Sequence, residues 1–200
     1  MTPRIFLALV VAVGWVGAGS AVGTDRELED LSVSNALGGP AVLSAIRTSP
    51  RIIARRVDQK PAPDRSASQP PAPPTPPDQL IPLGEPFELS DDLADSLRAT
   101  LTTGKTYLGV PKRCLFRANV LLTFSPPGER PVELVFCFGC GELQVWQEGK
   151  MIAFSPFDGG YSPLSEFAKA AFPNDPYLLT LSDAAFRERW LENAKTPPPD

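Results

Sequence analysis

Apolar positions that alternate along residues 117–154 predict neighbouring β-strands. The segments RANVLLTFS (117–125) and PVELVFCFG (131–139) both alternate, with the turn sequence SPPGER between them. ELQVWQ and MIAF follow, separated by the turn at 148–150. Short connections favour antiparallel pairing of successive strands. The residues expected to share one face are Ala118, Val120, Leu122 and Phe124, followed by Val132, Leu134, Phe136 and Phe138.

A different spacing predicts helices on both sides of these strands. Leu93, Leu97 and Leu101 are four residues apart and follow Ser90, a suitable N-cap. Similar apolar stripes occur in 164–171 and near 186–190. Together these elements predict an α+β fold: an antiparallel β-meander of three to five strands with two or three helices packed on one face.

The chain before residue 60 gives weaker signals. RIIARRV (51–57) predicts a strand with Ile53 and Val57 on one face, and its arginines are typical of a solvated strand edge. Pairing of this strand with the meander stays open. Residues 24–37 are mostly polar and predict a solvated arm, in which Leu28 and Leu31 mark at most one amphipathic turn.

Proline content divides the chain. The 24 prolines exceed ordinary usage and are dense in KPAPDRSASQPPAPPTPPDQ (60–79). Proline cannot donate to a strand ladder, so this composition predicts a semi-rigid spacer. We expect a signal peptide (1–21), an N-terminal segment with one possible strand (22–58), a proline-rich linker (59–79), a compact α+β domain (80–194) and a disordered tail (195–200).

The N-terminus indicates export. Arg4 precedes the apolar run IFLALVVAVGWVGAG, and small residues suited to cleavage follow it. This pattern predicts a secreted protein of the periplasm or the extracellular space. The alternative is an uncleaved N-terminal anchor, which would bring the protein to a membrane.

Charge and composition exclude several functions. The net charge is −4 without a long basic run, which argues against nucleic-acid binding. The chain has no histidine, which removes histidine-dependent hydrolases and histidine metal ligands. An enzymatic role is therefore uncertain and disfavoured.

Cys114, Cys137 and Cys140 carry the most distinctive chemistry, and four interpretations compete, the last of which is buried, inert cysteine or an intermolecular bridge. In the first, Cys114 forms a structural disulfide with one of the other two, because hairpin ends approach each other. That bond would close a loop of about 25 residues and stabilise the fold by about 3 kcal/mol. In the second, CFGCG resembles the knuckle of zinc ribbons and rubredoxins, and Cys114 with a carboxylate such as Glu142 would complete a zinc site.

The third interpretation is a thiol–disulfide redox pair of Cys137 and Cys140. In thioredoxin-like proteins such a motif opens a helix that activates the first thiol. Here the strand pattern GELQVW follows instead. No cofactor other than possible zinc is expected.

The segment FSPFDGGYSP (154–163) predicts a glycine- and proline-containing loop. Loops carry binding functions more often than strands do. Phe154, Phe157, Asp158 and Tyr161 are its candidate binding residues, and we expect its aromatic side chains to be exposed.

The stretch from KRCLF to LVFCFGCGELQVW, with AAFPNDP (170–176), resembles an uncharacterised family of exported or lipid-anchored bacterial proteins with a Cys…Cys-Phe-x-Cys pattern. The resemblance implies that the three cysteines belong together, and it implies no activity. We therefore expect an exported, non-enzymatic small domain with a structural or binding role, whose partner is an unknown protein or envelope component. The alternative is a thiol-based protein that uses zinc or a redox pair.

Overall fold

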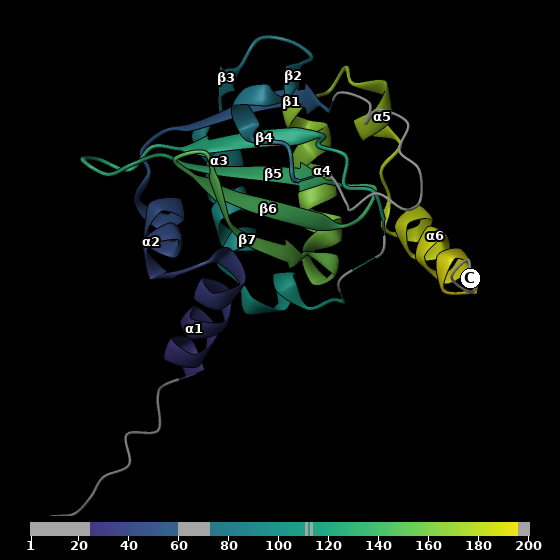
Figure 1. Ribbon diagram of the computed structural model, residues 1–200, viewed down its shortest axis with the longest axis horizontal. Coiled ribbons are helices and arrows are strands. Elements are labelled where there is room, and N and C mark those ends of the chain that lie inside the picture. The colour runs from purple at the N-terminus through teal and green to yellow at the C-terminus, as the bar shows by residue number, and fades with distance from the viewer. Residues whose placement is uncertain (1–24, 60–72, 111, 113, 196–200) are drawn as a thin grey trace, which may run out of the picture.

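The computed structural model describes residues 25–59, 73–110, 112 and 114–195 (Figure 1). The expected signal peptide, most of the proline-rich linker and nearly all of the C-terminal tail lie outside these residues. Six α-helices and a seven-stranded sheet form the described part. The predicted α+β class is confirmed.

An antiparallel sheet forms the centre of the molecule. Its order is β2-β1-β4-β5-β6-β7, with β3 also pairing with β1. The last four strands form the predicted meander, in which Val120 pairs with Phe136 and Leu134 with Val145. The strands are β1 (Ile52–Asp58), β2 (Ile81–Pro82), β3 (Phe87–Glu88), β4 (Val120–Phe124), β5 (Val132–Cys137), β6 (Glu142–Gln147) and β7 (Lys150–Pro156).

The early strand joins this sheet. β1 pairs with β4 from Ile52↔Phe124 to Arg56↔Val120, and with β2 and β3 on its other side. Residues on both sides of the proline-rich segment therefore contribute to one sheet, which answers the pairing question that the sequence left open.

Helices cover one face of the sheet and one of its edges. α3 (Asp91–Leu101) and α4 (Tyr161–Ala171) lie behind the sheet in Figure 1. α1 (Asp25–Leu37) packs against α2 (Pro40–Thr48) and against β7 at the edge. α5 (Pro176–Leu179) and α6 (Asp183–Lys195) follow, and the short 3-10 turns are η1 (Pro77–Gln79), η2 (Gly104–Tyr107) and η3 (Asp158–Gly160).

The expectation of a solvated arm at 24–37 was wrong, because residues 25–37 form α1. Its contact with the fold comes from Val33 and Leu37, both fully buried, whereas Leu28 and Leu31 are exposed. The apolar residues that anchor this segment are therefore Val33 and Leu37, not the predicted Leu28 and Leu31. α2 was missed as well, although it buries an apolar stripe that includes Val42 and Ile46.

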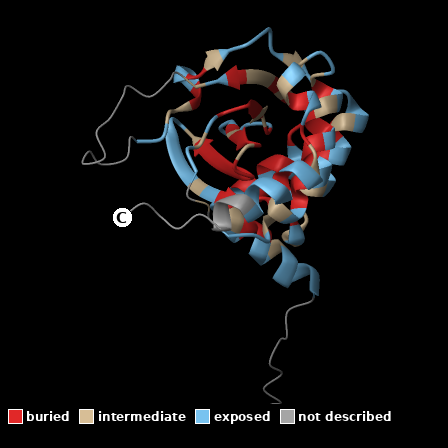
Figure 2. Ribbon diagram, turned by 90° about the vertical axis from the view of Figure 1, so that its right-hand side faces the viewer, coloured by how far each residue is buried: buried red, intermediate tan, exposed pale blue. Residues whose placement is uncertain are grey.

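The sheet separates two clusters of buried residues. The larger cluster lies between the sheet and the helices, where Figure 2 shows the buried residues gathered. It includes every predicted inward residue of the meander except Ala118. Ala118 packs instead in the smaller cluster on the opposite face, with Val57, Leu121 and Trp146. β4 begins only at Val120, so the strand alternation does not extend back to Ala118.

Candidate functional site: three cysteines beside an arginine-lined pocket

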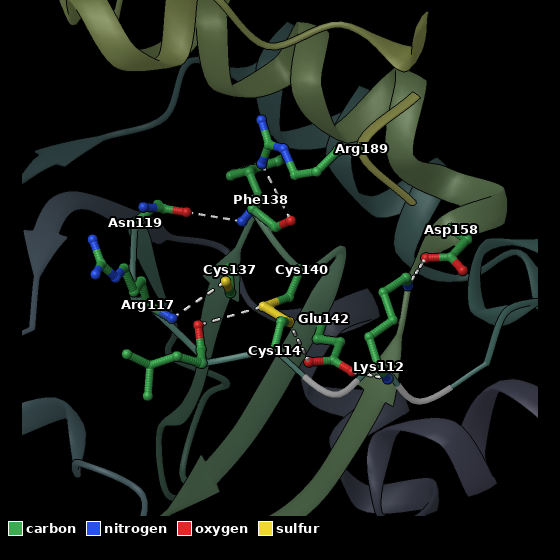
Figure 3. Close-up of a disulfide and its surroundings, with 12 residues drawn as sticks. Lys112, Cys114, Arg117, Asn119, Cys137, Phe138, Cys140, Glu142, Asp158 and Arg189 are labelled. Carbon is green, nitrogen blue, oxygen red and sulfur yellow. Dashed lines mark hydrogen bonds and ion pairs between the residues drawn. A yellow bond between two sulfur atoms is a disulfide. The ribbon is translucent and has the colours of Figure 1, made fainter. Parts of the chain in front are cut away.

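A disulfide joins Cys114 to Cys140 (Figure 3). Cys114 precedes β4, and Cys140 lies in the turn between β5 and β6. Their Cα atoms are 6.2 Å apart although 26 positions separate them in sequence. Pairing of β4 with β5 brings these two segments together, as the sequence analysis expected. Of the two partners that it left open for Cys114, the structure shows Cys140.

The turn that carries Cys140 depends on a glycine. The Gly141 amide donates to the Cys137 carbonyl at 2.9 Å. Gly141 has φ 65°, a conformation that side chains disfavour. A Cβ atom there would lie 2.6 Å from Cζ of Phe186, so α6 closes over this turn.

Cys137 is a free and buried thiol. It ends β5, is only 1% exposed and accepts a hydrogen bond from the Arg117 amide at 3.3 Å. Burial raises the pKa of this thiol, while the backbone amides of Arg117, Cys140 and Gly139 oppose the rise. The amides of Gly139 and Cys140 turn toward this sulfur, as in the metal knuckle that the motif resembles. A thiol held protonated by burial is a poor nucleophile.

Glu142 places a carboxylate against the disulfide. It is 1% exposed, and burial raises its pKa while the Lys112 backbone amide and the Lys112 charge oppose the rise. Its Oε1 accepts from the Lys112 amide at 2.8 Å, and its Oε2 lies 3.8 Å from Sγ of Cys114. The two disulfide sulfurs and a Glu142 oxygen lie within 4.8 Å of one another. Glu142 is the carboxylate that the sequence analysis named for a zinc site.

The predicted binding loop has little exposed aromatic surface. Phe157 and Tyr161 are buried in the larger cluster, so the expectation that they are exposed was wrong. Their rings stack on each other, with centroids 6.0 Å apart. Asp158 pairs with the Lys112 ammonium. Phe154 alone among the four is an exposed large hydrophobic residue, at 42%.

A pocket of about 450 Å³ lies beside the disulfide. Its charged lining consists of three arginines and one carboxylate, which come from β1, from the segment before β4 and from α6. Sequence reasoning missed this pocket because these elements are distant along the chain. The lining residues are Arg56, Asp58, Cys114, Leu115, Arg117, Asn119, Cys137, Gly139, Cys140, Tyr177 and Arg189.

The three arginines differ in their partners. Arg56 pairs with Asp175 at 2.8 Å, and its side chain is only 11% exposed, so it is not the solvated edge residue that we expected. Arg117 and Arg189 are exposed and form no ion pair within the described part of the chain. Among the described residues, Arg189 donates a hydrogen bond only to the Gly139 carbonyl, at 3.4 Å. The pocket therefore carries two arginines without an ion-pair partner in the described ranges, against one lining carboxylate, that of Asp58.

Fold and site together define an α+β protein with a disulfide-fixed hairpin and an electropositive pocket. Comparisons with protein-family models, with curated proteins and with solved structures found no match.

Proposed function

We propose that this protein is an exported binding domain that holds a small anionic ligand in the arginine-lined pocket. The observation that carries the proposal is the pair Arg117 and Arg189, which line one pocket without a carboxylate partner among the described residues. A carboxylate or phosphate group would supply the missing partner.

The rest of the pocket suits a small ligand. Its volume of about 450 Å³ lies within the range of small-molecule sites. Leu115 and the Tyr177 ring provide apolar surface, and Asn119 and Gly139 add polar groups. The disulfide fixes one wall and the Arg56–Asp175 pair holds another, so the cavity is formed in advance of binding.

A binding role agrees with the chemistry of the chain and of the residues that line the pocket. The chain has no histidine to act as a general base. The free thiol of Cys137 is buried, and burial raises its pKa. These features favour binding over nucleophilic catalysis.

Export is supported by the N-terminal pattern and by the disulfide, a bond typical of oxidising compartments. Within the described residues, no helix has the length and apolar character needed to cross a membrane. Expression of the full chain in a bacterial host tests export. Recovery from the periplasm or medium with a mass that lacks residues 1–21 is the expected result, and an intact cytoplasmic chain contradicts it.

Calorimetric titration of the oxidised protein with citrate and with inorganic phosphate tests the binding role. We expect saturable binding of at least one anion that weakens as salt rises. Arg117→Gln and Arg189→Gln should each weaken binding about 10-fold to 100-fold, because a hydrogen bond to a charged group contributes about 1.5–3 kcal/mol.

Arg51→Gln is the matched control. Arg51 is an exposed arginine that pairs with Glu88 outside the pocket, so its replacement should leave the affinity unchanged. Failure of both anions to bind at millimolar concentration, or equal weakening in all three variants, contradicts the proposal.

A further inference from the structure

We propose that reduction of the Cys114–Cys140 disulfide creates a Zn²⁺ site whose ligands are Cys114, Cys140 and Glu142. The inference goes beyond the proposed anion binding, because it uses other atoms and the reduced form of the protein. It rests on the position of the Glu142 carboxylate against the two sulfurs (Figure 3).

The spacing of the three ligand atoms suits zinc. The two sulfurs and the carboxylate oxygen lie within 4.8 Å of one another. Tetrahedral zinc with Zn–S bonds of about 2.3 Å holds its sulfur ligands about 3.8 Å apart. The sulfurs of a disulfide are about 2.0 Å apart, so after reduction they have to separate by about 1.8 Å before an ion fits between them and the carboxylate. Thiolate and carboxylate are both established zinc ligands.

In the oxidised protein, one oxygen of the Glu142 carboxylate lacks a hydrogen-bond donor among the described residues. The neighbour of its Oε2 is Sγ of Cys114 at 3.8 Å, and a disulfide sulfur carries no proton to donate. No other donor reaches this oxygen within the described residues. Because Glu142 is 1% exposed, its Oε2 is a buried acceptor without a donor, aimed at the two sulfurs. A buried carboxylate oxygen without a donor is costly, and a bound cation would remove that cost.

Surrounding groups hold the candidate ligands in place. The Lys112 amide donates to Oε1 of Glu142 and so orients the other oxygen toward the sulfurs. The Leu115 carbonyl lies 3.5 Å from Sγ of Cys140. Cys137 stands beside the same turn, with backbone amides directed at its sulfur. The fourth position of a tetrahedral site would be taken by water.

One dithiol supplies the two electrons and two protons that reduction of the disulfide requires. A dithiol transfers two electrons to the Cys114–Cys140 bond; the bond breaks, each sulfur gains a proton, and the dithiol becomes a disulfide. Zn²⁺ then displaces the two thiol protons and binds the carboxylate of Glu142. Oxidation reverses the sequence and releases the ion, so metal binding would report the redox state.

The test is an anaerobic titration of the full mature chain with Co²⁺ after reduction by a phosphine. A thiolate-to-cobalt charge-transfer band that saturates at one ion per chain, and that Zn²⁺ abolishes, is the expected result. The oxidised protein should show no such band. Zinc bound after gel filtration, measured by elemental mass spectrometry, gives an independent readout.

Variants identify the ligands. Cys114→Ser, Cys140→Ser and Glu142→Gln should each weaken zinc binding by more than about 100-fold, since even loss of an outer-sphere partner costs about 10-fold to 100-fold. Glu133→Gln is the control, because Glu133 is a carboxylate of the neighbouring strand outside the cluster. Cys137→Ser should still bind one ion.

Several outcomes would overturn the inference. They are no metal uptake by the reduced protein, equal uptake by the oxidised protein, and full affinity in Glu142→Gln. Loss of binding in Cys137→Ser with retention in Cys114→Ser would also do so. Glu142→Gln keeps all three cysteines, so its fold can be verified in the oxidised state before reduction. Anion binding is measured on the oxidised protein, so either proposal can fail without the other.

Discussion

The Arg56 guanidinium on β1 donates to the Asp175 carboxylate at 2.8 Å across 119 positions of sequence. Both side chains are largely buried, at 11% and 17% exposed. Arg56 also donates to the carbonyls of Val57 and Asn119 and lies 5.6 Å from the centroid of the Tyr177 ring. Oδ1 of Asp175 accepts from the Leu178 amide at the start of α5. The Asp175 carboxylate thus connects α5 to β1 and to Arg56 in the pocket lining.

Asp175→Asn should remove the ion pair and keep the cap. We expect a loss of about 3 kcal/mol in the free energy of unfolding, because a buried guanidinium is left without its counter-charge. Asp175→Ala should lose about 1 kcal/mol more, since the Leu178 amide also loses its acceptor. Urea unfolding measures both. Equal stability of the wild type and Asp175→Asn would mean that the pair contributes nothing.

The thiol count should follow the pairing of the cysteines. The native protein should react negligibly with iodoacetamide, because Cys137 is 1% exposed and burial raises the pKa of its thiol. Denaturation without reduction should expose one thiol, and reduction should expose three. Intact mass after alkylation gives each number. Cys137→Ser, the control, should show none before reduction, and a thiol there would show incomplete or different pairing.

The disulfide should stabilise the fold substantially. Replacing both Cys114 and Cys140 by alanine should lower the free energy of unfolding by about 3 kcal/mol, because the bond closes a loop between positions 26 apart. Urea unfolding of the oxidised protein and of the double variant measures this loss. In the presence of a phosphine reductant the two proteins should become nearly equal. A difference that persists after reduction would indicate lost packing instead of lost chain constraint.

Local patterns in the sequence predicted the elements that have strong periodicity. The alternation in β4 and β5 and the leucine stripe of α3 each depend on neighbouring residues, and each proved correct in type. α1 was missed because Val33 and Leu37 are one turn apart in a mostly polar segment whose other leucines, Leu28 and Leu31, are exposed. Their burial depends on α2 and β7, which the segment itself does not reveal.

The candidate site was predictable only in part. The grouping of Cys114 with the CFGCG turn followed from the hairpin, and Glu142 followed from its position next to that turn. The arginine-lined pocket did not, because Arg56, Arg117 and Arg189 meet only after β1 pairs with β4 and α6 folds over the turn. Long-range pairing of this kind leaves no local pattern in a single sequence.

Glu142 should make stability depend on pH. Burial raises its folded-state pKa above the ordinary 4.5, so the folded chain retains a proton that the unfolded chain has lost. The free energy of unfolding therefore falls as pH rises from about 4.5 through the folded-state pKa. Glu142→Gln carries no charge, so the oxidised variant should gain stability over the wild type between about pH 4 and about pH 7.

Urea unfolding of both proteins at the two pH values measures this gain. Glu129→Gln is the control, because it alters an exposed carboxylate in the turn between β4 and β5. Its free energy of unfolding should match that of the wild type at both pH values. A Glu142→Gln variant that loses stability relative to the wild type as pH rises would reverse the assigned direction.

Alanine substitutions at Gly141 and Gly128 distinguish the cost of a steric clash from the cost of backbone strain. Both have positive φ, 65° and 71°, but a Cβ at Gly141 would lie 2.6 Å from Phe186, whereas one at Gly128 meets nothing within 4 Å. Gly128→Ala should therefore cost only the strain of about 1 kcal/mol. Gly141→Ala should cost about 1–3 kcal/mol more in urea unfolding, because Phe186 must move. It should also weaken anion binding, since displacement of α6 carries Arg189 away from the Gly139 carbonyl. Equal losses in the free energy of unfolding of the two variants would show that α6 moves at no cost and does not fix the shape of the pocket.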